Sequence, residues 1–190
     1  MMKSAIICTL MAVVAHAFSP APSLISNTRS HTSLSMATVT EGNGGGVVIT
    51  GSAGGVGFAY AEEFLRRGYD VVICDVKDCS NAAKALSSRF NGPDVGQVFH
   101  TKCDVSDAKS VEKLGEFAKS KLGTIGYWIN NAGVNGGRRA LMDVPVNQVE
   151  LVVKVNLMGT LLCTKVAMDI MANQVSQLFF LFSFVVLQYD

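Results

Sequence analysis

The chain has 190 residues, which is enough for one domain and short for two. Sixteen Lys and Arg residues against fifteen Asp and Glu residues leave a formal net charge of +1, so the charge gives no support for nucleic acid or an anionic membrane surface as a partner. Five cysteines without a C-x-x-C pair and three scattered histidines predict reduced thiols and no metal site.

The first 40 residues have the composition of targeting signals. Residues 1–17, MMKSAIICTLMAVVAHA, combine one lysine, an apolar stretch and an A-x-A-like end, which predicts a secretory signal peptide. Residues 18–40 are rich in serine and threonine and contain no acidic residue, as transit peptides do. The tandem arrangement, with Phe18 directly after the predicted cleavage site, resembles the bipartite plastid leaders of algae with complex plastids. We therefore expect a plastid protein, with plain secretion as the alternative, and a flexible linker over residues 41–46, EGNGGG.

Apolar runs alternate with helical patterns over residues 47–174. Strands are predicted over residues 47–50, 69–75, 97–104 and 125–129, and helices over residues 58–67, 81–90, 111–122 and 146–173. Alternation at βαβ spacing predicts an α/β fold, a Rossmann-type doubly wound parallel sheet covered on both faces. We expect this domain to be partial, truncated after the fourth strand and the helix that follows it.

Residues 175–190, VSQLFFLFSFVVLQYD, differ sharply from the rest of the chain. They carry one charge, at the last residue, and their apolar run of about ten residues is shorter than the ~20 that a bilayer requires. The abrupt change in composition is typical of translation into a retained intron. We expect an anomalous apolar tail produced by a gene-model artefact, with a genuine buried strand as the alternative.

Glycines are concentrated where the first strand gives way to the first helix, in VVITGSAGGVGFAYAEEF (residues 47–64). In a βαβ unit this turn directs backbone N–H groups and the positive end of the helix at one point, and a phosphate reaches them only where no Cβ intervenes. Gly51 allows a tight exit from the strand, Gly55 allows close approach, and Gly57 allows close packing of the helix. Asp75 ends the second strand eighteen residues after Gly57, where it is placed to accept hydrogen bonds from a ribose. The pattern predicts a nucleotide site.

The spacing T-G-x-x-x-G-x-G from Thr50 to Gly57, together with NNAG at residues 130–133, resembles the short-chain dehydrogenase/reductase superfamily over about residues 46–174. The resemblance implies that the glycine loop holds a dinucleotide pyrophosphate, that Asp104 holds the adenine, and that Asn156 matches the asparagine of the catalytic tetrad. The cofactor-binding residues implied in this way are Thr50, Gly51, Gly55, Val56, Gly57, Asp75, Asp104, Val105, Asn131, Ala132 and Gly133.

Asp75 bears on the choice between NAD and NADP as cofactor. A carboxylate at this position repels the 2′-phosphate of NADP, and the glycine loop carries no basic residue to hold that phosphate, so NAD is favoured. Lys77 lies nearby in the sequence and weakens this preference.

The superfamily pairs hydride transfer with proton transfer through a tyrosine that has a lysine four residues later, and a serine orients the substrate carbonyl. No Y-x-x-x-K follows Asn156 in this sequence. Ser183 falls near the expected distance after Asn156, but Tyr189 follows it too soon, and we interpret both spacings as coincidence. We expect this polypeptide to be inactive and poorly stable.

Residues 128–174 point to one branch of the superfamily. The motif WINNAG, the Asn-Gly-containing loop after it, and the later LCT and AMD are similar to plastid chlorophyll b reductases, which reduce a 7-formyl group to hydroxymethyl. This resemblance implies a tetrapyrrole pigment as substrate and peripheral thylakoid contact, with Arg138 and Arg139 either steering an acidic side chain or forming a solvated loop. That family tends to favour NADPH, in contrast to Asp75. The alternatives are another plastid short-chain reductase acting on a lipid or small carbonyl, and a catalytically dead nucleotide-binding regulatory protein; the sequence does not indicate an oligomeric state.

Overall fold

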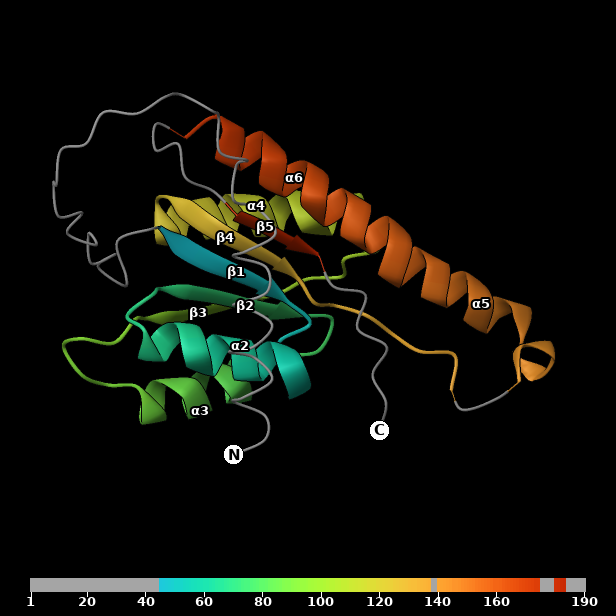
Figure 1. The fold of residues 1–190 in the computed structure, drawn as a ribbon, viewed down its shortest axis with the longest axis horizontal. Coiled ribbons are helices and arrows are strands. Elements are labelled where there is room, and N and C mark those ends of the chain that lie inside the picture. The colour runs from blue at the N-terminus through green and yellow to red at the C-terminus, as the bar shows by residue number, and fades with distance from the viewer. Residues whose placement is uncertain (1–44, 138–139, 175–179, 184–190) are drawn as a thin grey trace, which may run out of the picture. The chain divides into compact units, whose positions relative to one another are not determined.

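Five parallel strands form one sheet in the order β3-β2-β1-β4-β5 (Figure 1). The computed structural model describes residues 45–137, 140–174 and 180–183, so the predicted leader, most of the linker, Arg138, Arg139 and the rest of the tail lie outside the described residues. The strands are β1 (Gly46–Thr50), β2 (Val71–Asp75), β3 (Val98–Lys102), β4 (Ile125–Asn130) and β5 (Phe180–Ser183). The chain moves outward from β1 to β3 and then returns to pair β4 with the other side of β1, which places a topological switch point between β1 and β4.

Helices cover both faces of the sheet, so the predicted doubly wound architecture is confirmed. The helices are α2 (Gly55–Arg66), α3 (Ser80–Arg89), α4 (Ala108–Leu122), α5 (Val146–Val152) and α6 (Thr160–Ala172), with a short 3-10 turn η1 (Leu141–Asp143) and a π-helical segment η2 (Val153–Gly159). Helices α2 and α3 pack on one face, and α4 and α6 pack on the other (Figure 1).

The core has two halves because successive strand residues point to opposite faces. Val48, Val72 and Trp128 pack with Leu114 of α4 and Ala167 of α6, all of them buried. On the α2 face, the rings of Phe64, Tyr69 and Tyr127 lie with centroids 5.4 to 5.5 Å apart. Burial, with a hydrogen bond to Tyr69, raises the pKa of Tyr127 to about 12, which is opposite to the lowered pKa that a proton-donating tyrosine requires near neutral pH.

The sheet does not stop at its fourth strand, and this corrects the expected truncation point. Residues Phe180–Ser183 pair with Tyr127–Asn130 in parallel, with Ser183 opposite Asn130. These four residues form a strand, because a β-rich apolar run can complete the ladder beside β4. The origin of the tail, as an artefact or as a genuine buried strand, stays a prediction.

The long predicted helix over residues 146–173 is present but is divided. Its backbone passes from α5 through the π-helical η2 into α6, so one turn is wider than an α-helical turn. Val146–Ala172 is long and apolar enough to cross a membrane by length and composition alone. Its α6 part packs on β4 and α4 and buries Cys163, Ala167 and Met171, so this part serves as a covering helix of the sheet.

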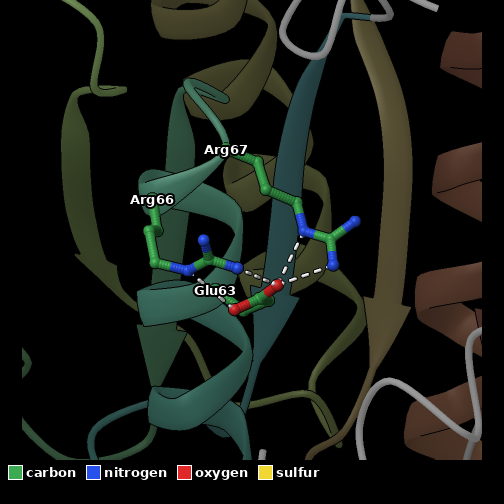
Figure 2. A network of polar contacts seen from close by, with 3 residues as sticks. All are labelled: Glu63, Arg66 and Arg67. Atoms are coloured by element: carbon green, nitrogen blue, oxygen red, sulfur yellow. Dashed lines mark hydrogen bonds and ion pairs between the residues drawn. The ribbon is translucent and has the colours of Figure 1, made fainter.

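An ion-pair cluster closes the last turn of α2. Glu63 accepts hydrogen bonds from Arg66 at 2.7 and 3.1 Å and from Arg67 at 2.7 Å, and Figure 2 shows both guanidinium groups converging on its carboxylate. The side chain of Glu63 is only 17% exposed. Although this burial raises the pKa of the Glu63 carboxyl, the hydrogen bonds from Arg66 and Arg67 outweigh it and leave the pKa below the ordinary 4.5.

Replacing Glu63 by glutamine is expected to lower the free energy of unfolding by about 1 kcal/mol at neutral pH, because an ion-pair cluster that water still reaches contributes little more. The folded-state pKa is depressed, so this contribution is present above the unfolded pKa and is lost as pH falls through the folded one. Urea unfolding of both proteins between pH 7 and pH 3 measures this. The exposed pair Lys165–Asp169 supplies the control, since Asp169→Asn should change little. A Glu63→Gln difference that stays the same from pH 7 to pH 3 would contradict the assignment.

Candidate functional site

A cavity of about 760 Å³ opens at the carboxyl edge of the sheet, at the switch point between β1 and β4. Its walls come from the β1–α2 loop, from the segments after β2, β3 and β4, and from α5 and η2. The lining residues are Gly51, Ala53, Gly54, Gly55, Asp75, Val76, Lys77, Cys103, Asp104, Val105, Ser106, Asn131, Ala132, Gly133, Val134, Asn135, Gln148, Leu151 and Val155.

The glycine loop is shaped by close backbone contacts. Gly51 has φ +65°, and a Cβ there would lie 2.6 Å from the Cα of Ala132. A Cβ on Gly57 would lie 2.5 Å from the carbonyl oxygen of Gly51, so the first turn of α2 packs directly on the loop. Gly54, at the N-cap of α2, faces the cavity, and a Cβ on it would meet no atom within 4 Å. The amino end of a twelve-residue helix therefore meets the cavity with no side chain in between.

Ser52 anchors this loop, although it occupies one of the unspecified positions of the glycine motif. Its fully buried hydroxyl donates to the Ile49 carbonyl at 2.7 Å and accepts from the Cys74 amide at 3.0 Å, which ties the loop to β1 and β2. The sequence alone does not distinguish a serine that anchors a turn in this way from a serine that is exposed to solvent.

Asp75 ends β2 on the cavity wall. One carboxylate oxygen accepts from the Ala53 amide at 3.2 Å, and the other accepts from the Lys77 amide at 3.1 Å. The carboxylate thus fixes the loop and the β2 end together while its remaining lone pairs face the cavity. Val76 and Lys77 line the cavity beside it and could have been found from their place directly after a strand end.

Asp104 and Val105 follow β3 and also line the cavity. The Asp104 carboxylate accepts from the amide and the hydroxyl of Ser106, at 2.9 and 2.7 Å, and the Asp104 amide donates to the Ser110 hydroxyl oxygen at 3.0 Å. These bonds hold the turn that leads into α4, so the position of the carboxylate is fixed by the start of that helix.

The segment after β4 is held to β1 by Thr50. The buried Thr50 hydroxyl oxygen accepts from the amides of Asn131 and Ala132, at 3.1 and 3.0 Å. The side-chain amide of Asn131 donates to the carbonyls of Thr50 and Gly51, at 3.0 and 2.9 Å. Asn131 lines the cavity, and its buried Oδ1 has no hydrogen-bond partner among the described residues. A buried acceptor without a partner costs about 1 to 3 kcal/mol, so this atom is suited to a donor from a ligand.

Asn156 lies behind the cavity wall in the π-helical segment η2. Its Oδ1 accepts from the Val134 amide at 2.8 Å, and its Nδ2 donates to the Val134 carbonyl at 2.9 Å. Its own carbonyl accepts the Thr160 hydroxyl at 2.7 Å. The side chain therefore positions the segment after NNAG, and the catalytic role expected for Asn156 stays a prediction.

Replacing Asn156 by alanine is expected to lower the free energy of unfolding by about 1 to 3 kcal/mol, because both backbone polar groups of Val134 would lose their partners in a partly buried place. Urea unfolding of the variant measures the loss. Asn173→Ala is the matched control, since Asn173 donates to the Asp169 carbonyl from an exposed position and should cost much less. Equal losses in the two variants would contradict the positioning role.

The predicted residues divide between the cavity wall and the layer that supports it. Gly51, Gly55, Asp75, Asp104, Val105, Asn131, Ala132 and Gly133 line the cavity. Thr50 and Gly57 lie behind the wall, and Val56 points elsewhere with 39% of its surface exposed. Ser183, whose spacing after Asn156 we interpret as coincidence, has its backbone level with Asn130 at the same sheet edge. Within residues 45–137 and 140–174, no group of His, Cys, Asp or Glu is arranged to hold a metal ion.

The parallel doubly wound sheet, the glycine turn at its switch point and the acid at the end of β2 define a Rossmann-type nucleotide-binding fold. The chain belongs to the short chain dehydrogenase family, whose family model matches residues 46–178. The oxidoreductases of this family generally use NAD or NADP. Three features of the cavity fit such a dinucleotide: the glycine loop at residues 51–57, the amino end of α2, and the Asn131 Oδ1 that has no partner among the described residues.

Several proteins of this family are similar to the chain. The "Probable chlorophyll(ide) b reductase NYC1, chloroplastic" of Arabidopsis thaliana is 38% identical over an alignment of 145 residues, and the match covers 67% of this chain and 29% of that protein. The "Chlorophyll(ide) b reductase NOL, chloroplastic" of the same plant is 37% identical over 67% of this chain and 36% of its own length. The "Short chain dehydrogenase/reductase dpmpG" of Macrophomina phaseolina is 32% identical, and the match covers 67% of this chain and 71% of that protein.

The fold is shared with a solved structure of a putative short-chain dehydrogenase from Novosphingobium aromaticivorans, with a TM-score of 0.59 and 24% identity. That match covers 65% of this chain and 44% of the other. The chain therefore spans less than half of that structure and about a third of the chlorophyll(ide) b reductase relatives.

Proposed function

We propose that this chain carries the dinucleotide-binding part of a plastid short-chain reductase. The observation that carries the proposal is the uncovered amino end of α2 at Gly54 and Gly55, which faces a cavity also lined by Asp75 and by Asn131 with its orphaned Oδ1. Backbone N–H groups and the helix dipole together favour a diphosphate at this point. Asp75 would accept the adenine-side ribose hydroxyls, and Asp104 would hold the adenine. The bound cofactor would supply or accept a hydride.

Dinucleotide titration of the chain tests this proposal, with Gly54→Asp as the informative variant. Gly54 has φ −173°, which any residue adopts, and an aspartate at an N-cap accepts helix amides, so the stability of the variant should be unchanged or slightly raised. Its charge would repel the diphosphate, and we expect the affinity to fall at least about tenfold. Gly54→Asn is the uncharged control. No saturable uptake by the natural chain, or equal affinity in the Asp and Asn variants, would reject a diphosphate site here.

We further propose that the reductase is of the chlorophyll(ide) b reductase type and acts in the plastid. Support comes from the names of the relatives and from the similarity of residues 128–174 to that family. On the α5 side the cavity is lined by the apolar Leu151 and Val155 together with Gln148. Before Leu151 along the chain, Leu141 and Met142 of η1 are 79% and 90% exposed, and Val146 at the start of α5 is 73% exposed. This end of α5 extends past the sheet (Figure 1). Such a surface suits a large apolar macrocycle better than a small carbonyl compound.

Pigment binding by the dinucleotide-saturated chain separates the candidate functions. Chlorophyllide b should bind to the chain, and the binding should quench fluorescence. Chlorophyllide a, which lacks the 7-formyl group, is the matched control pigment. Val146→Asp, at an exposed position, should weaken pigment affinity without changing dinucleotide affinity. Binding of a lipid aldehyde but no pigment would favour the other plastid reductase, and dinucleotide binding with neither substrate would favour the nucleotide-binding regulatory protein.

A further inference from the structure

One hydrogen bond joins two segments of the chain at the rim of the cavity. The side-chain Nε2 of Gln148, in α5, donates to the backbone carbonyl of Asn135, in the segment after β4, at 2.9 Å. Both residues line the cavity. The bond therefore links the wall that comes from the edge of the sheet to the wall that comes from α5.

The local sequence explains why the Gln148 side chain is available for this contact. Gln148 is the third residue of α5, whose N-cap residue is Pro145. A glutamine at this position usually reaches back to the backbone N–H of the N-cap residue. Proline has no backbone N–H, so this partner is missing, and the Gln148 amide makes its hydrogen bond outside the helix instead.

The segment that receives the bond is already held from behind. Asn156 of η2 pairs with both backbone polar groups of Val134. The Asn135 Oδ1 accepts from the Gly137 amide at 3.1 Å, which closes a tight turn two residues long. This side of the rim is thus fixed without any contribution from Gln148.

The start of α5 has no comparable support from packing. None of the seven residues of α5 is buried, and Figure 1 shows this end of the helix extending past the sheet. Among the residues that the structure describes, the bond from Gln148 is the one hydrogen bond that connects a side chain of α5 to the segment after β4. Leu151 and Val155, which line the cavity about one and two turns after Gln148, take their position from the same helix.

We propose that Gln148 is a positioning residue, which holds the α5 wall of the cavity in place for the substrate and leaves the dinucleotide site unaffected. The residues assigned to the dinucleotide belong to the glycine loop and to the segments after β2, β3 and β4, which the sheet supports. Loss of the bond would free the start of α5 to move away from Asn135, and the substrate would lose part of its contact with Leu151. The identity of the substrate rests on the proposed function, whereas the positioning of α5 by Gln148 does not.

Hydrogen exchange of the full chain tests the positioning of α5 without any ligand. Gln148→Met keeps the length and the helix propensity of the side chain but has no donor, so the α5 amides from Val149 onward should exchange roughly two- to tenfold faster than in the natural chain. Gln148→Lys keeps a donor for the Asn135 carbonyl and should stay within about twofold of the natural chain. Asn147→Asp, at an exposed position of the same turn, is the control and should not speed exchange.

Gln148→Glu separates the hydrogen bond from a general effect on the helix end. A negative charge in the first turn stabilises a helix and a positive charge destabilises it, so a role in helix stability alone predicts slower exchange in Gln148→Glu than in Gln148→Lys. The proposed bond predicts the reverse order, because an ionised glutamate has no proton to donate to the Asn135 carbonyl. Exchange in the order of helix stability, or unchanged exchange in Gln148→Met, would overturn the proposal.

Ligand titration tests the consequence for the site. The affinity of the dinucleotide-saturated chain for chlorophyllide b should fall at least about threefold in both Gln148→Met and Gln148→Glu, while dinucleotide affinity stays within about twofold. A loss confined to Gln148→Glu would indicate charge repulsion, and an equal loss of dinucleotide affinity would assign Gln148 to the cofactor; either result would overturn the proposal. Failure of the natural chain to bind pigment would reject the proposed function, while hydrogen exchange would still decide whether Gln148 positions α5.

Discussion

Replacing Gly51 by valine is expected to destabilise the fold by about 3 kcal/mol or more and to abolish dinucleotide binding. The backbone of Gly51 has φ +65°, a region that costs an ordinary L-residue ~1 to 2 kcal/mol and a β-branched residue more. The new Cβ would also lie 2.6 Å from the Cα of Ala132, which is backbone and cannot rotate away. The loop would have to move off the end of β4, and the Thr50 and Asn131 hydrogen bonds that join the two segments would be lost with it.

The control for this change lies three residues away in the same loop. Gly54→Ala introduces a methyl group that meets no atom within 4 Å in a backbone conformation that alanine adopts freely. It should change the free energy of unfolding by less than about 1 kcal/mol, because the loss of a preferred N-cap residue is offset by the lower entropy of the unfolded chain. Urea unfolding of both variants, with dinucleotide titration in parallel, gives the comparison. Similar stability in Gly51→Val and the natural chain would show that the loop does not pack on Ala132 as described.

The fold was predictable from sequence where one pattern decides the structure. The strands predicted over residues 47–50, 69–75 and 125–129 correspond to β1, β2 and β4, which are apolar and largely buried, and such runs are recognisable as strands without tertiary information. The predicted start of α2 is three residues late, because the first turn of this helix is built from glycines and valine, which carry no helical signal. The π-helical turn around Asn156 leaves no trace in the spacing of apolar residues and could not be predicted.

The candidate site was predictable at the strand ends and not in its supporting layer. Asp75 and Asp104 follow strands, and parallel strands bring their carboxyl ends to one edge, so their convergence on the cavity follows from the fold. Gln148 and Leu151 reach the same cavity from α5, and only the three-dimensional path of the loop between NNAG and this helix decides that. The anchoring of the loop by Ser52, which accepts from the Cys74 amide, depends on register between strands, which the sequence leaves open.

Replacing Asp75 by asparagine is expected to shift the ratio of NAD to NADP affinity toward NADP by roughly 10- to 100-fold, or about 1.4 to 2.8 kcal/mol. The carboxylate faces the cavity beside Lys77, and it would lie against the 2′-phosphate that distinguishes NADP from NAD. Removing its charge removes the repulsion and exposes that phosphate to Lys77, while NAD loses one acceptor for its ribose hydroxyls. The variant keeps one oxygen for the amides of Ala53 and Lys77, so a modest stability loss of about 1 kcal/mol accompanies the change.

Asp104→Asn separates a specific effect at the ribose from a general loss of negative charge at the cavity. Asp104 lines the same cavity and likewise holds a local turn through its carboxylate, but its assigned partner is the adenine, which NAD and NADP share. It should weaken both dinucleotides by a similar factor and leave their ratio unchanged. Calorimetric titration of NAD and NADP at two salt concentrations measures both ratios, and the shift in Asp75→Asn should shrink at the higher salt because screening weakens a charge effect in the natural chain. If the two variants change the ratio equally, the preference comes from the net charge of the cavity rather than from Asp75, and the ribose assignment at the end of β2 is wrong.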